Sequence, residues 1–244
     1  HEVAHFVKEN LPKLILDARF KADAMAAVLS RAFVTAQELL LAAEGTDTVS
    51  ASESGTTATI IVHDHAKQKL YCANVANSTA VLGRQEGEQE GSLAALPLTQ
   101  NHQPEFPEER ERIEGSGGCV IYDSFVYHRV YAGDSKFPAL NMSRSLGDLI
   151  AHDTCGITAE PSVSEVDIGP KDKVLILCSD GIWEFITHVE AVEMAFLYPP
   201  TTKARAMASA ERLAREAWDR WVRVEGGSVV DDITVLLVYL DAGA

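Results

Sequence analysis

The sequence predicts an α+β fold, in which helices and strands occupy separate parts of the chain. Two amphipathic helical patterns come first, a group of short apolar strands follows, and two more helices precede a last strand. Elements grouped by type are typical of layered α+β folds, whereas alternating strands and helices indicate parallel sheets. With 244 residues, 46% of them hydrophobic, the chain can bury one large core, so we expect a single compact domain over residues 1–244.

Helices are predicted where apolar residues recur three or four positions apart. This spacing covers residues 2–17, 22–43, 187–197 and 202–222. The last of these helices places four side chains on one face, namely Met207, Leu213, Ala217 and Trp221. A short polar helix is predicted over residues 105–114, because Pro104 and Pro107 lie near its start and glycines follow its end.

Strands are predicted in the middle of the chain and at its end. Short apolar runs cover residues 57–63, 70–75, 80–83, 119–122, 125–131 and 233–240. The polar turn at residues 64–67 indicates an antiparallel hairpin, and we expect a second hairpin between residues 73–75 and 80–82. Residues 174–178 form a continuous apolar run, which is typical of a strand buried on both faces. Residues 45–55 and 87–92 are expected to be loops or turns.

Composition argues against two classes of protein. The formal net charge of −15 and an isoelectric point near 4.9 disfavour nucleic-acid binding, because phosphate backbones would be repelled. No apolar run reaches the roughly 18 residues of a membrane helix, and no secretory leader pattern opens the chain. The four cysteines are widely spaced without a CxxC pair, which favours a reducing compartment over structural zinc. We expect a monomeric intracellular protein, cytoplasmic or nuclear, with no membrane span.

Acidic residues stand at the ends of predicted strands. Asp180 directly follows the buried run, Asp231 precedes the last strand, and residues 142–148 carry a third acidic signature. Carboxylate oxygens held at strand ends are ligands for Mg²⁺ or Mn²⁺. The alternative is that Asp180 is a helix cap or turn residue and Asp231 a turn residue before its strand.

One histidine-rich segment, His63-Asp64-His65, resembles a zinc cluster by composition. Because adjacent residues of a strand point to opposite faces, we interpret this segment as a turn.

Eight short motifs occur in an order that resembles the metal-dependent protein phosphatases of the type 2C family. They lie at residues 54–58, 73–82, 98–104, 109–118, 140–148, 160–161, 179–184 and 231–235. Two of them are Ser-Asp-Gly-Ile-Trp-Glu at 179–184 and Asp-Asp-Ile-Thr-Val at 231–235. Each motif alone is a weak match, but their shared order makes the resemblance specific. The resemblance extends from residue 2 to about residue 241.

The resemblance implies a fold and a reaction. The fold would be a four-layer α-β-β-α sandwich, with two antiparallel sheets flanked by helix pairs. The reaction would be hydrolysis of phosphoserine and phosphothreonine on proteins by a water that bridges two Mg²⁺ or Mn²⁺ ions, without a protein nucleophile. Asp180 and Asp231 would bind metal. The family's N-terminal strand and Asp-Gly-His-Gly motif, which supplies the bridging aspartate, are absent from this sequence.

Several positions depart from the family pattern. At the family's weaker third metal site, this chain has Asn101 and Glu184 where the family has aspartates. Asn77 replaces the aspartate of a Gly-Asp-Ser turn, and Ala76 replaces its glycine. We expect a third ion to bind less well here, and the loss of the carboxylate at position 77 to disturb groups that orient metal-bound waters.

Three more residues have both a functional and a structural interpretation. Arg144 could contact substrate phosphate, or it could pair with nearby carboxylates. His102 could act as a general acid, or it could be a loop histidine hydrogen-bonded to the backbone. Asp148 is expected to be structural, capping the loop after Gly147.

Two functions follow from these motifs. The first is a metal-dependent protein serine/threonine phosphatase. The alternative is a catalytically impaired pseudophosphatase that acts as a binding or scaffold protein, which Asn77 and Asn101 favour.

Overall fold

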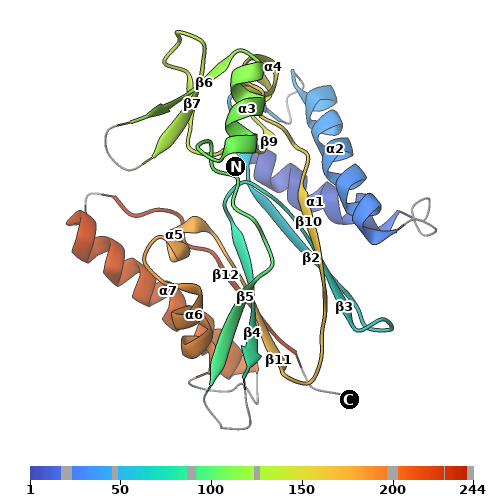
Figure 1. Ribbon diagram of the computed structural model, residues 1–244, viewed down its shortest axis with the longest axis vertical. Coiled ribbons are helices and arrows are strands. Elements are labelled where there is room, and N and C mark those ends of the chain that lie inside the picture. Colours follow the sequence, from blue (N-terminus) through green and yellow to red (C-terminus); the bar gives the residue numbers. More distant parts are fainter. Residues whose placement is uncertain are drawn as a thin grey trace. The chain divides into compact units, whose positions relative to one another are not determined.

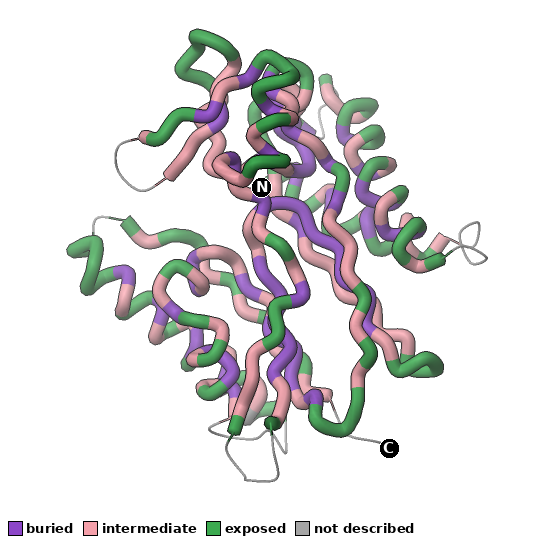
Figure 2. The backbone as a smooth tube through the Cα atoms, in the orientation of Figure 1, coloured by how far each residue is buried: buried purple, intermediate pink, exposed green. Residues whose placement is uncertain are grey.

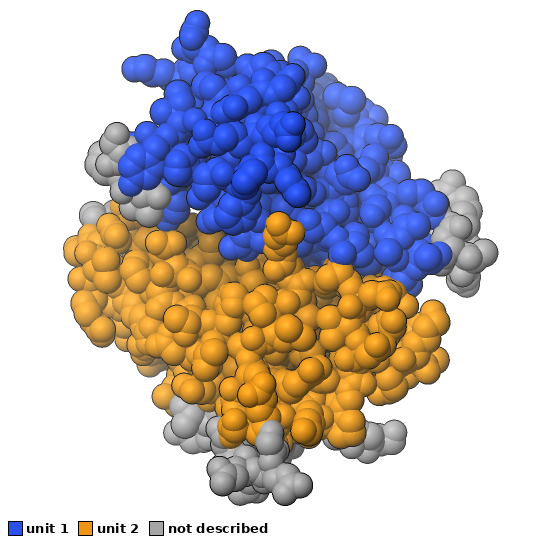
Figure 3. Space-filling model, viewed as in Figure 1, with its two compact units in different colours: residues 1–60, 73–77, 101–163 blue, residues 61–72, 78–100, 164–244 orange. Residues whose placement is uncertain are grey.

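The computed structural model describes residues 1–17, 24–45, 49–86, 92–123, 127–196, 203–227 and 229–240. The chain divides into two compact units (Figure 3), each assembled from three separate segments. Unit 1 comprises His1–Ile60, Ala73–Asn77 and Asn101–Val163, and unit 2 comprises Ile61–Cys72, Ser78–Gln100 and Ser164–Ala244.

Unit 1 combines helices with short antiparallel strands. Its helices are α1 (Glu2–Leu16), α2 (Met25–Ala43), α3 (Pro107–Gly115) and α4 (Leu149–Cys155). Its strands are β1 (Gly55–Thr56), paired with β9 (Leu146–Gly147), and an antiparallel sheet of β6 (Gly118–Tyr122), β7 (His128–Ala132) and β8 (Pro138–Leu140). Helices α1 and α2 pack on each other. A separate core of α3, α4 and the three-stranded sheet is built around Ile113, Val130 and Cys155.

Unit 2 contains a four-stranded antiparallel sheet in the order β12-β11-β4-β5. These strands are β4 (Thr79–Gln85), β5 (Leu93–Pro97), β11 (Asp172–Cys178) and β12 (Val235–Tyr239). Helices α6 (His188–Phe196) and α7 (Lys203–Glu225) cover one face of this sheet, and the short α5 (Asp180–Trp183) follows β11 (Figure 1). Val174 and Ile176 of β11 pack there against Val192 of α6 and Leu213 of α7. The predicted burial of residues 174–178 is confirmed, with Leu177 partly accessible (Figure 2).

The other face of this sheet packs on a second sheet. That sheet has the order β10-β3-β2, with β2 at Ala58–Asp64, β3 at Lys69–Val75 and β10 at Ser162–Asp167. Successive side chains of a strand point to opposite faces of its sheet. Leu82 of β4 and Leu175 of β11 therefore point away from the helices, and they pack with Leu70 and Cys72 of β3. Unit 2 alone therefore has a helix layer, a sheet and the packed side chains of a second sheet, as the α+β prediction requires.

Several sequence predictions need correction. The hairpin expected between residues 73–75 and 80–82 is wrong, because β3 and β4 belong to different sheets. Met207 is 54% exposed, whereas Leu213, Ala217 and Trp221 are buried. Some predictions fall outside the described residues. These are the start of the helix predicted from residue 22, the start of the strand predicted from residue 125, the turn at 87–91, the end of the helix predicted at residue 197, and the start of the helix predicted from residue 202.

Some elements could not be predicted, because the sequence shows no clear pattern for a helix or strand there. Strand β10 is only half-buried, β1, β8 and β9 have two or three residues each, and α4 and α5 are a few residues long. Such short segments carry too few residues for a periodic pattern to be read.

Helix α2 is a weak candidate against the expectation that no segment crosses a membrane. Among the described helices it alone is long and apolar enough to do so. A core helix of a globular protein passes the same test. Helix α2 buries Val28, Leu29, Phe33 and Leu40 while packing on α1, so it also fits the description of a core helix.

Candidate metal centre

The end of β11 is joined to the segment before β12 by hydrogen bonds of Ser179. Its hydroxyl donates to the carbonyl oxygen of Asp232 (2.7 Å) and accepts from the amide of Thr234 (3.0 Å). Its amide donates to the carbonyl oxygen of Thr234 (3.2 Å). The two segments that carry Asp180 and Asp231 therefore lie side by side, so the structure brings the two predicted metal-ligand segments together.

The turn after Ser179 is packed tightly. A Cβ atom at Gly181 would lie 2.5 Å from the carbonyl oxygen of Asp232, closer than any side chain allows. The indole of Trp221 donates to the carbonyl of Gly181 (2.7 Å), and the indole of Trp183 donates to the carbonyl of Cys178 (3.1 Å). The glycine permits the close approach of the two segments, and the two tryptophans fix the backbone around it. Trp183 is partly buried and packs against the core of unit 2.

The side chains at this junction are oxygen donors. Asp180 is half-buried at the start of α5, and Asp231 and Asp232 are exposed. Among the residues that the structure describes, no lysine or arginine is ion-paired with Asp231 or Asp232. Carboxylate oxygens are the donors that Mg²⁺ and Mn²⁺ prefer. However, no cluster of three or more potential ligands occurs in the described part of the chain. The oxygen donors are therefore chemically suited to a hard cation, but a complete metal site needs ligands in addition to these carboxylates.

The other predicted ligands are distributed between the units. Glu184 is exposed in unit 2, just after α5, whereas Asn77 and Asn101 lie in unit 1. The amide of His102 donates to the carbonyl of Ala76 (3.1 Å), so the two segments with asparagine substitutions are adjacent. Ala76 is fully buried and has a φ of 72°. This left-handed conformation favours the glycine that the family pattern has at this position.

Arg144 binds a carboxylate rather than standing free. Its Nε atom lies 3.1 Å from both carboxylate oxygens of Glu109, its Nη2 atom also binds Glu109, and its Nη1 atom donates to the carbonyl of Glu160 (2.8 Å). Arg112 donates to the same carboxylate (2.8 Å), and the Ser143 hydroxyl donates to it as well. Of the two interpretations of Arg144, the structure supports carboxylate pairing. Glu109 was missed from the sequence, since a glutamate in a polar helix resembles any exposed one.

His102 is buried, with 1% of its surface exposed. Its Nε2 atom lies 2.8 Å from the Ser162 hydroxyl, and its Nδ1 atom has no partner among the described residues. The ring is therefore held by the Ser162 side chain, while the backbone amide of His102 is bonded to Ala76. Burial lowers the pKa of His102 to about 4, so the ring is neutral at pH 7.

Asp148 is a structural residue, as expected, although its side chain does not cap α4. It is buried, and burial raises its pKa. Its carboxylate lies against Gly55 of β1, and β1 pairs with β9 just before Asp148. The motifs at residues 54–58 and 140–148 are therefore packed together within unit 1.

We expect Gly55→Ala to destabilise the protein by about 1–3 kcal/mol, because the new methyl group would overlap the buried Asp148 carboxylate. Urea unfolding of the single variants and of Gly55→Ala/Asp148→Ala measures the coupling between the two sites. If the contact is the cause, the double variant loses less stability than the sum of the single variants. Strictly additive losses would contradict this.

Stability should fall with acid in two steps. Burial lowers the pKa of both His102 and His152 to about 4, so their contributions are present above their unfolded pKa near 6.5 and are lost as pH falls toward 4. Burial would raise the pKa of Glu109, but hydrogen bonds from Arg144, Arg112 and Ser143 lower it to about 2. Its contribution is lost between about pH 4.5 and pH 2. Melting temperatures between pH 7 and pH 3 test this, and His152→Gln should flatten the upper step. An unchanged upper step in this variant would contradict the assignment.

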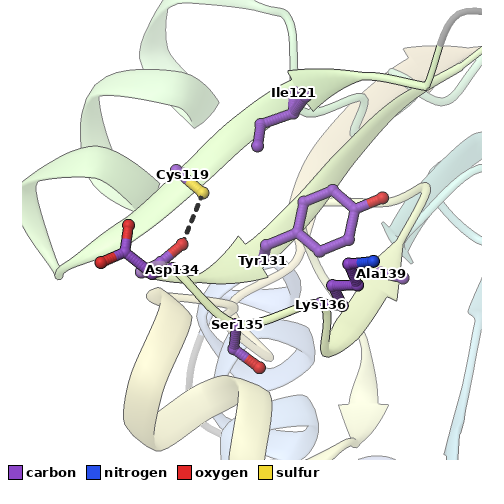
Figure 4. A pocket seen from close by; sticks show the side chains of 8 residues that line it. Cys119, Ile121, Tyr131, Asp134, Ser135, Lys136 and Ala139 are labelled. Carbon is purple, nitrogen blue, oxygen red and sulfur yellow. Dashed lines mark hydrogen bonds between the residues drawn. The ribbon is translucent and has the colours of Figure 1, made fainter.

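A hollow lies elsewhere in unit 1, over the β6-β7-β8 sheet (Figure 4). Tyr131, Asp134 and Lys136 line it, and the Cys119 thiol donates to the carbonyl of Gly133 (3.1 Å) beside it. None of the predicted metal ligands lines this hollow, which opens widely to solvent, so it does not belong to the candidate centre.

Comparison with known proteins identifies the motifs. Residues 1–223 match the family model described as Protein phosphatase 2C. Probable protein phosphatase 2C 73 of Arabidopsis thaliana is 37% identical over 193 residues, covering 78% of this chain and 49% of the relative. Probable protein phosphatase 2C 48 of Oryza sativa subsp. japonica is 33% identical over 259 residues, covering 98% of this chain and 71% of the relative.

Solved structures show the same fold. Serine-threonine phosphatase 2C from Toxoplasma gondii matches 96% of this chain and 80% of its own, with a TM-score of 0.78 and 20% identity. A C. elegans sex determining protein matches 98% of this chain and 53% of its own, with a TM-score of 0.75 and 19% identity. The chain spans about half the length of the two Arabidopsis thaliana relatives that it matches at 37% and 35% identity.

Proposed function

We propose, from the premise that this chain belongs to the protein phosphatase 2C family, that the protein containing it removes phosphate from phosphoserine and phosphothreonine on other proteins. The supporting observation is the Ser179 junction. Its hydrogen bonds hold the Asp180 and Asp231 segments together at the end of a buried sheet.

The proposed cofactors are two Mg²⁺ or Mn²⁺ ions, with a weaker third ion. Asp180 and Asp231 would hold metal, and the remaining carboxylate would come from an Asp-Gly-His-Gly motif outside this sequence. Bound ions would neutralise phosphate charge and activate water for attack on phosphorus. Ser179, Gly181 and Trp221 position the carboxylates by fixing the backbone on either side of them. Asn77, Asn101 and Glu184 are candidates for weaker contacts to the third ion or to its waters.

The outer strand β12 supports the proposal that a further strand completes the sheet. Leu236 and Val238 are the register partners of Leu177 and Leu175, whose side chains belong to the core between the two sheets. Even so, Leu236 is 53% exposed and Val238 is 40% exposed. An edge strand with exposed apolar side chains is normally covered or paired. An added strand from the longer protein would cover it, as the greater length of the relatives also suggests.

The deciding experiment is Mn²⁺-dependent hydrolysis of a phosphothreonine peptide by the full-length protein. Asp180→Asn and Asp231→Asn should each lower activity at least about 10- to 100-fold, the range typical even for outer-shell substitutions at metal sites. Asp153→Asn, an exposed aspartate of α4, is the matched control and should leave activity unchanged. Equal activity in all variants would refute the assignment of these ligands.

A folded full-length protein that is inactive in millimolar Mn²⁺ would instead indicate a non-catalytic binding protein. The family relatives are named as phosphatases, so the comparisons give this alternative no support. We further propose phosphorylated proteins as the binding partners, a monomeric state, and an intracellular location.

A further inference from the structure

The β2–β3 turn brings two histidines into contact in unit 2. His63 lies near the end of β2 and His65 is the first residue of the turn that follows. Their ring centroids are 3.7 Å apart, with the ring planes tilted by 35°. Residues two positions apart on a strand share a face, so the alternation that separates His63 from Asp64 places His63 and His65 together. Interpreting this segment only as a turn missed that pairing.

The turn itself is held by local hydrogen bonds. The Asp64 carboxylate accepts from the amide of Lys67 (3.0 Å) and is ion-paired with its ammonium group (3.1 Å). The Gln68 side chain donates to the carbonyl of His65 (2.8 Å). These contacts fix the backbone between and after the two histidines, and they engage the Asp64 carboxylate with a cation.

One nitrogen of the pair lacks a partner. The Nε2 atom of His63 is buried and makes no hydrogen bond within the described residues. Buried polar atoms almost always have a partner, and an orphan indicates an unseen water or ion. Burial also lowers the pKa of His63, which keeps the ring neutral at pH 7, the form that binds metals.

We propose that His63 and His65 form a two-nitrogen site for a borderline transition-metal ion such as Zn²⁺, separate from the carboxylates of the candidate centre. Imidazole nitrogen is a ligand for Zn²⁺ and Cu²⁺, whereas Mg²⁺ and Mn²⁺ prefer oxygen. Binding would require the two rings to unstack, so that one nitrogen from each points toward a shared ion. No third protein ligand completes the set in the described residues, so water fills the other positions and the ion exchanges readily.

Calorimetric titration of the chain with Zn²⁺ alone tests the proposal. His63→Gln and His65→Gln should each weaken one class of Zn²⁺ binding by at least about tenfold, the lower limit for outer-shell substitutions at metal sites. His5→Gln, an exposed histidine of α1, is the matched control and should leave that class unchanged. Circular dichroism confirms that the variants are folded, and imidazole proton shifts on adding Zn²⁺ locate the ion.

The same titration separates this site from the carboxylate centre. Asp180→Asn should leave the histidine-dependent class intact, whatever its effect on Mn²⁺ binding or phosphatase activity. Unchanged Zn²⁺ binding in His63→Gln/His65→Gln would overturn the proposal and leave the two rings as a stacked pair. A Zn²⁺ class lost only in Asp180→Asn would overturn it as well.

Discussion

Replacing Glu109 with glutamine is expected to lower the free energy of unfolding by about 3–5 kcal/mol, the usual cost of removing one partner from a buried ion pair. The carboxylate is 4% exposed and accepts hydrogen bonds from Arg112, Arg144 and Ser143. Glutamine removes the negative charge and leaves two guanidinium groups with an amide that cannot neutralise them. Urea unfolding at pH 7 measures the loss.

Glu111→Gln is the control for this variant. It makes the same change in the same helix α3, at an exposed position. We expect a change within about 0.5 kcal/mol, as for surface substitutions in general. If Glu109→Gln also cost less than about 1 kcal/mol, the paired arginines would be solvated in solution and the network would contribute little.

Gly181→Ala is expected to cost about 1–3 kcal/mol of stability, because overpacking that moves backbone is destabilising. The new methyl group would lie 2.5 Å from the Asp232 carbonyl oxygen and 3.2 Å from its carbon. Neither atom can rotate away, so the whole segment before β12 must shift. The stabilisation that Mn²⁺ gives to the full-length protein should fall too, since an ion stabilises only through its affinity for the folded state.

The control is Gly115→Ala at the last residue of α3, where a Cβ atom would meet nothing within 4 Å. Alanine is a better helix former than glycine, so this variant should be neutral or slightly stabilised. Melting temperatures with and without Mn²⁺ separate the two effects of Gly181→Ala. An unchanged Mn²⁺ response would show that the position of Asp231 does not depend on the junction.

Sequence patterns predicted the elements whose burial is uniform along their length. Strand β11 was predicted from a continuous apolar run, and the apolar face of α7 from Met207, Leu213, Ala217 and Trp221, of which only Met207 is exposed. The junction of the two acidic segments could be anticipated only through the family motifs, because periodicity says nothing about which strand ends meet. Ser179 joins them through backbone groups of residues more than 50 positions away, a contact that local patterns cannot encode.

Contacts between residues far apart in the chain also explain the features that the sequence failed to predict. Glu109 was not distinguished from the other glutamates of α3, because its arginine partner Arg144 lies 35 residues away. Strands β3 and β4 were expected to form a hairpin because a short connection normally joins neighbours. The sheet to which β4 belongs is set instead by its pairing with β11, far along the chain.

The interleaving of the two units decides which fragments of this protein can be made. Each unit takes its residues from three stretches of sequence, and the chain changes unit inside strands β2, β3 and β10. No single cut therefore releases either unit intact and alone. A protease that nicks an exposed turn should leave two pieces held together until denaturant is added. Studies of the acidic junction will accordingly depend on point variants of the intact chain.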